Sequence, residues 1–179
     1  MIYTIVTYGN EVLRSKATPV IEVTDDIRVL AASMLDTMYA SNGVGLSAEQ
    51  IGRTESICVI DIPEDAEKKE FRQANSSIEM PLIMINPQII SVTGEQRDEE
   101  GCLSFPKIGV MITRAEQATV SFTNLQGIRQ TLTTGGLLAR AVQHELDHLD
   151  GILLVDKMNA VQKLAASGKL RRLQRQAQQ

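Results

Sequence analysis

The spacing of apolar residues predicts two helices and a set of short strands. Apolar side chains recur at three- and four-residue intervals early in the chain, at Ile27, Leu30, Met34 and Met38. This spacing predicts an amphipathic helix over residues 25–40, with Thr24 as its N-cap. A second helix is predicted from about residue 133 to 150, and the stretch 156–179 is also helix-prone.

Short apolar or alternating runs predict strands between these helices. They cover residues 57–62, 82–85 and 89–92, and a hairpin turns at 124–127. Residues 1–23 are interpreted as an extended arm. The polar segment 63–80 is interpreted as an exposed loop. The pattern therefore predicts an α+β fold.

Composition narrows the class of protein. Hydrophobic residues make up 43% of the 179 positions and aromatic ones only 3%, which predicts one domain over residues 1–179 with an aliphatic core. The net charge of -4 argues against bulk nucleic-acid binding. Two cysteines make no disulfide framework, and neither a signal peptide nor a membrane span is recognisable. We expect a soluble, cytoplasmic protein.

A candidate metal site lies on the second predicted helix. Residues 144–148 read His-Glu-Leu-Asp-His, and they contain the only two histidines of the chain. His144 and His148 share a helix face, so both imidazoles can bind one metal ion, while Glu145 can reach a water at that ion. The alternative is a pair of surface or core histidines with no metal, which the absence of any other histidine disfavours.

The third protein ligand must come from upstream, because residues 152–179 contain no His or Glu. Cys102 is the best candidate, since it follows Gly101 in a polar context and its thiolate would balance two neutral imidazoles. Cys58 lies in an apolar run and is interpreted as a core residue. A Gly-rich segment, residues 43–50, can let a peptide backbone approach, and Gln50 can then donate to a developing oxyanion.

These three segments together resemble the motifs of the peptide deformylase family, in the same order. Residues 43–50 resemble its first motif, residues 100–104 match its second and residues 143–148 match its third. The N-terminal arm is also similar, so the resemblance covers nearly the whole chain. It departs from the family at Ser47, where Ala is usual, in a longer 63–80 segment, and after Pro106, where an arginine found in some members is missing.

The resemblance implies a fold, a reaction and a metal. It implies antiparallel sheets packed around a central metal-binding helix, with a further helix at the C-terminus. The reaction it implies is removal of the N-formyl group from formyl-methionine at the start of newly made proteins, with release of formate. Fe²⁺ would be the native metal, and Zn²⁺, Ni²⁺ or Co²⁺ would also fit the site.

Chemistry and family together imply a role for each site residue. Glu145 would transfer the proton, and Gln50 with the backbone N–H of Leu103 would stabilise the oxyanion. The remaining substrate-binding positions are expected to hold the methionine side chain and the peptide backbone: Val44, Gly45, Gly101, Leu137 and Ala141.

Two other functions remain open from the sequence. A metallopeptidase with the same helix motif is disfavoured because the downstream metal ligand of such peptidases is missing. A catalytically inactive binding protein on the same fold is disfavoured because Glu145, Gln50 and all three proposed ligands are intact. The protein is expected to be a monomer. Residues 156–179 carry six basic residues against one acidic residue, so this C-terminal helix is a candidate ribosome contact as well as a solvated helix face.

Overall fold

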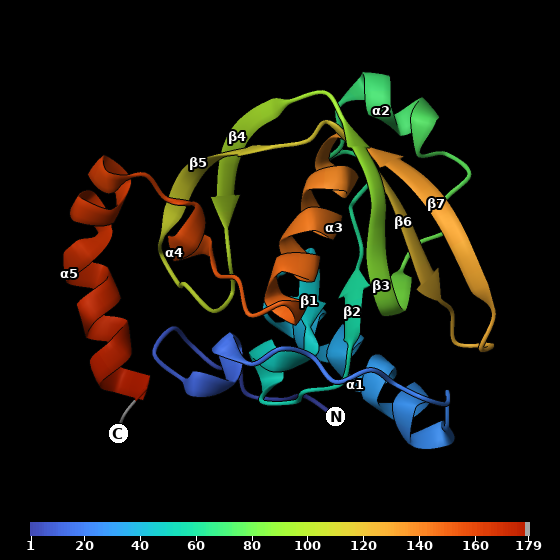
Figure 1. Ribbon diagram of the computed structural model, residues 1–179, viewed down its shortest axis with the longest axis horizontal. Coiled ribbons are helices and arrows are strands. Elements are labelled where there is room, and N and C mark those ends of the chain that lie inside the picture. The colour runs from blue at the N-terminus through green and yellow to red at the C-terminus, as the bar shows by residue number, and fades with distance from the viewer. Residues whose placement is uncertain (178–179) are drawn as a thin grey trace.

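Two antiparallel sheets flank a central helix in the computed structural model, which describes residues 1–177 (Figure 1). The five-stranded sheet has the order β1-β2-β3-β6-β7. Its strands are β1 (Gly45–Ser47), β2 (Ile57–Ile60), β3 (Leu82–Thr93), β6 (Gln117–Thr123) and β7 (Arg129–Gly135). The second sheet is a hairpin of β4 (Gln96–Gly101) and β5 (Gly109–Arg114).

Helices surround and connect these sheets. The α-helices are α1 (Asp25–Ala40), α2 (Lys69–Ala74), α3 (Gly136–Leu149), α4 (Leu154–Lys157) and α5 (Ala160–Ala177), and two short 3₁₀ helices are η1 (Glu11–Arg14) and η2 (Ala48–Ile51). In Figure 1, α3 lies between the two sheets and α5 lies outside the β4–β5 hairpin. The predicted α+β class with a C-terminal helix is confirmed.

Strand β2 is buried on both faces, which explains its continuous apolar sequence. Successive side chains of a strand point to opposite faces of the sheet. Ile57 and Val59 belong to the core that α1 covers, whereas Cys58 and Ile60 belong to the core that α3 covers. The sheet is therefore held between two helices, and α3 is fixed over its inner face.

A third apolar cluster attaches the C-terminal helix to the rest of the protein. Ala166, Leu170 and Leu173 of α5 are buried and share this cluster with Leu13 and Phe105. The buried positions follow helical spacing, so α5 packs one apolar stripe inward and leaves its other sides exposed. Within residues 1–177, no helix has the length and apolarity needed to cross a membrane.

Several sequence predictions need correction. The 63–80 segment is more than an exposed loop, because it contains α2 and the buried Glu67. The two strand pieces at 82–92 form one strand, since a register shift near Asn86 absorbs the interruption. The central helix begins at Gly136, because residues 133–135 still pair with β6.

Candidate metal and active site

Three side chains with metal-binding atoms meet beside α3. The ligand atoms of Cys102, His144 and His148 all lie within 4.8 Å of one another. Cys102 directly follows the last residue of β4, and the two histidines are one turn apart on α3. Sγ of Cys102 lies 3.3 Å from Nε2 of His148. One thiolate and two imidazoles suit a divalent transition metal, so the residues present fit the metal that the sequence predicts.

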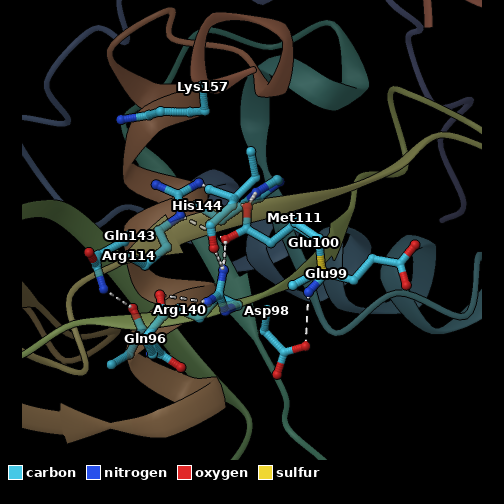
Figure 2. Close-up of polar contacts among 12 residues, drawn as sticks. Gln96, Asp98, Glu99, Glu100, Met111, Arg114, Arg140, Gln143, His144 and Lys157 are labelled. Carbon is cyan, nitrogen blue, oxygen red and sulfur yellow. Dashed lines mark hydrogen bonds and ion pairs between the residues drawn. The ribbon is translucent and has the colours of Figure 1, made fainter. Parts of the chain in front are cut away.

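A buried carboxylate orients the first histidine (Figure 2). Oε2 of Glu100 lies 3.0 Å from Nδ1 of His144, which leaves Nε2 of that ring available to a metal. Arg114 donates two hydrogen bonds to Glu100, of 2.7 and 3.0 Å, and Arg140 donates a third of 2.8 Å. Burial alone would raise the pKa of Glu100, but His144 and Arg114 hold it well below its ordinary value. The carboxylate therefore stays ionised.

The side chain of Gln50 is held on both of its ends. Its Oε1 accepts hydrogen bonds from the backbone N–H of Ser47 at 3.0 Å and from the Ser47 hydroxyl at 3.2 Å. Its Nε2 lies 3.5 Å from Sγ of Cys102 and 3.3 Å from Oγ of Ser104. Because Ser47, at the end of β1, holds the acceptor end, the N–H groups are directed toward Cys102 and Ser104. Ser47, one of the departures from the family pattern, contributes its hydroxyl to this orientation.

The carboxylate of Glu145 lies beside Gly45 and is almost fully enclosed. The side chain of Glu145 is buried, and a Cβ atom at Gly45 would collide with its carboxylate, so a larger residue there would displace that carboxylate. Burial raises the pKa of Glu145 to about 7, against smaller opposing effects of His144 and the Ser47 hydroxyl. Such a value suits a group that both takes and returns a proton near neutral pH.

A cleft of about 600 Å³ opens onto these residues. All the site residues expected to touch substrate line it: Val44, Gly45, Gln50, Gly101, Leu103, Leu137, Ala141 and Glu145. Cys102 and His144 line it as well, whereas His148 is not among its lining residues and is 1% exposed. The sequence prediction missed the rim residues Glu99 and Lys107, because it did not foresee the β4–β5 hairpin.

Comparison with known proteins gives a single family. The sequence profile described as Polypeptide deformylase matches residues 2–164. A peptide deformylase of Desulfitobacterium hafniense is 47% identical over 156 residues, which span 87% of this chain and 94% of the relative. Another, from Nitrosococcus oceani, is 40% identical over 174 residues, or 97% of each chain.

Solved structures agree with this result over the whole fold. The crystal structure of a peptide deformylase from Legionella pneumophila superposes with a TM-score of 0.84 at 37% identity, covering 100% of this chain and 99% of that one. A peptide deformylase from Synechococcus elongatus, in complex with actinonin, gives a TM-score of 0.81 at 36% identity, covering 93% of this chain and 87% of the other. The chain therefore belongs to the peptide deformylase family.

Proposed function

We propose that Cys102, His144 and His148 hold one divalent metal ion in this enzyme and that Glu145 is its acid and base. The convergence of these three ligands beside Glu145 at the cleft is the observation that carries the proposal. As a peptide deformylase, the enzyme hydrolyses the formamide at the N-terminus of newly made peptides and releases formate.

Each step of this reaction has a residue suited to it. The metal, when bound, supplies the Lewis acidity that lets water ionise near neutral pH. Glu145 accepts the proton of the attacking water, whose oxygen forms a bond to the formyl carbon. When the C–N bond breaks, Glu145 returns the proton to the departing amine.

The developing negative charge on the formyl oxygen needs hydrogen-bond donors. Nε2 of Gln50 is already directed toward Cys102, and we assign the backbone N–H of Leu103 as the second donor. Losing one such donor typically lowers the rate by roughly 100- to 1,000-fold. Because Ser47 fixes the amide of Gln50 in advance, little reorganisation is needed as the charge develops.

The cleft also offers an apolar site for the methionine side chain of the substrate. Val44, Leu137 and Ala141 present apolar surface suited to methionine, while Gly45 and Gly101 leave room for the peptide backbone. These five residues form the proposed substrate site, and formyl-methionyl nascent peptides are its proposed occupants.

The metal and the cellular setting are further parts of the proposal. Thiolate and imidazole ligands accept several divalent ions, and we propose Fe²⁺ as the native one, with Zn²⁺, Ni²⁺ or Co²⁺ as substitutes. We also propose a monomeric, cytoplasmic enzyme whose residues 1–179 form one catalytic domain. The exposed residues Arg171, Arg172 and Arg175 form a basic side of α5, which is the proposed contact with the ribosome.

One assay tests the proposed reaction against its alternative. A formyl-methionyl tripeptide and the same tripeptide without the formyl group are incubated with the metal-loaded protein, and formate and free amines are measured. We expect one formate for each new amine from the first peptide and no product from the second. Cleavage of an internal peptide bond in either peptide would instead indicate a metallopeptidase.

A further inference from the structure

The central helix α3 begins without a cap of its own. Gly135 and Gly136 stand at its start, no side chain of the helix caps it, and its first turn contains no acidic residue. The first backbone N–H groups of any helix have no partner within the helix and need acceptors from elsewhere. The acceptors for α3 must therefore come from another part of the chain.

Glu67, from the 63–80 segment, supplies these acceptors. Its Oε1 accepts the backbone N–H of Leu137, and its Oε2 accepts that of Leu138, both at 3.0 Å. Glu67 is only 5% exposed. A buried carboxylate at this position satisfies two N–H groups and also places a negative charge at the positive end of the helix dipole.

Two neighbours of Glu67 fasten the same segment to the residues before the helix. The side-chain amide of Asn75 accepts from the backbone N–H of Gly135 and donates to its carbonyl oxygen, both at 3.0 Å. The ring of Phe71 lies so close to Gly135 and Gly136 that a Cβ atom at either position would collide with it. Gly136 also has φ +60°, a conformation that favours glycine.

Polar contacts attach α2 to the start of α3, whereas Ile78 and Met80, near the end of the segment, pack against the apolar core. No residue of α2 is buried, so the short helix has no apolar stripe of its own in the core. A second cavity, of about 530 Å³, lies between parts of the segment and α3, with Glu67, Asn75 and Leu138 among its lining residues. Losing the Glu67 carboxylate should therefore loosen the contact between α2 and the start of α3, because α2 has no buried apolar side chain to replace it.

We propose that residues 63–80 form a clamp on the start of α3, in which Glu67 is a positioning residue for the methionine pocket. Leu137, whose N–H the carboxylate holds, also lines the substrate cleft. Ala141 follows one turn later on the same side of the helix. Glu67 thus acts on substrate selection through the placement of Leu137. The inference rests on the proposed role of Leu137 in the methionine pocket.

Two measurements on metal-loaded Glu67→Gln test the clamp, with Glu70→Gln as the matched control at an exposed position of the same segment. The first is amide hydrogen exchange at Leu137 and Leu138. We expect exchange to become about tenfold faster or more at one or both of them, because the amide offers one acceptor oxygen where the carboxylate offers two. The second is steady-state kinetics with formyl-methionyl and formyl-alanyl tripeptides.

The kinetic prediction separates positioning from general damage. KM for the formyl-methionyl peptide should rise about tenfold, whereas KM for the formyl-alanyl peptide, whose side chain is too short to depend on the pocket wall, should stay within about twofold. kcat for both should also stay within about twofold. A purely structural role would lower activity toward the two peptides equally.

The outcomes decide between the clamp and its alternatives. Unchanged exchange at Leu137 and Leu138, or faster exchange with an unaltered preference for methionine, would overturn the inference. If the wild-type enzyme removes no formyl group, the proposed function fails while the exchange experiment still tests the cap. Should Glu67→Gln not fold, Glu67→Asp keeps the charge but shortens the reach, and the same differences are expected from it.

Discussion

Nδ1 of His144 and Oε2 of Glu100 lie 3.0 Å apart, and the same carboxylate is bound by two buried arginines. Glu100 thus orients the ring of His144, whose other nitrogen, Nε2, is the one proposed to bind the metal. Arg114 extends the network to Asp147 on α3, at 2.5 Å. The β4–β5 hairpin and the central helix are tied together at the point where their proposed metal ligands meet.

Glu100→Gln should therefore weaken metal binding without removing a ligand. The neutral amide cannot accept from His144 and both arginines as the carboxylate does, so we expect the metal affinity to fall roughly 10- to 100-fold. Competition with a chelator, followed by metal analysis, measures this change. Asp98→Asn, at an exposed position of the same strand, is the control and should bind metal as the wild type does. Equal affinities for the two variants would show that Glu100 does not support the site.

Replacement of each proposed ligand should have a larger effect. Cys102→Ala, His144→Ala and His148→Ala should each lose most of the bound metal and all useful activity, because only two protein ligands remain. Cys58→Ala is the matched control, since its thiol lies in the apolar core and takes no part in the site. A Cys102→Ala protein with full metal content and full rate would remove Cys102 from the ligand set.

Much of this site could be predicted because its residues are close in sequence or chemically rare. His144 and His148 share a helix face by spacing alone, and Cys102 was the better of only two cysteines. The hairpin that carries Glu100 could not be predicted, because β4 is mostly charged and exposed and shows no apolar alternation. The burial of Glu67 was also missed, since its partners are backbone N–H groups 70 and 71 residues away, which no local pattern reveals.

Glu145→Gln should separate metal binding from proton transfer. The amide is nearly the same size, so the variant should keep its metal and bind substrate, but it cannot accept the proton of water. We expect kcat to fall by roughly 100- to 10,000-fold. Metal stoichiometry and kcat are measured on one preparation. Parallel loss of metal and activity would reassign Glu145 as a ligand.

The identity of the metal can be tested by the conditions of purification. If Fe²⁺ is native, anaerobically prepared enzyme should contain iron, and exposure to air should lower its activity through oxidation or through replacement by Zn²⁺. Reloading with Ni²⁺ or Co²⁺ should preserve activity in air, because the thiolate and imidazole ligands accept these ions. Equally fast and equally air-stable iron and zinc forms would contradict the assignment.

The proposed ribosome contact of the C-terminal helix has the least structural support. Its test needs variants that change the surface charge of the helix and leave its packing intact. Deleting residues 160–179 is the direct test of ribosome docking, but Leu170 and Leu173 are buried, so the deletion would also uncover part of the core. Charge reversal at exposed positions avoids this problem. The triple variant Arg171→Glu, Arg172→Glu and Arg175→Glu changes only exposed side chains and leaves the buried residues of α5 in place. Residues 178–179 of the predicted tail lie outside the described residues.

This triple variant should lose co-sedimentation with ribosomes at low salt while its turnover of a short formyl-peptide stays nearly unchanged. Contacts to RNA phosphates release counterions, so binding of the wild type should also weaken steeply as salt rises. The control reverses three exposed charges elsewhere, Lys68→Glu, Lys69→Glu and Arg97→Glu, and should sediment like the wild type. If both triple variants sediment with ribosomes equally well, the basic side of α5 has no docking role and is only a solvated surface. The packing of its buried residues against the domain would then be its one assigned role.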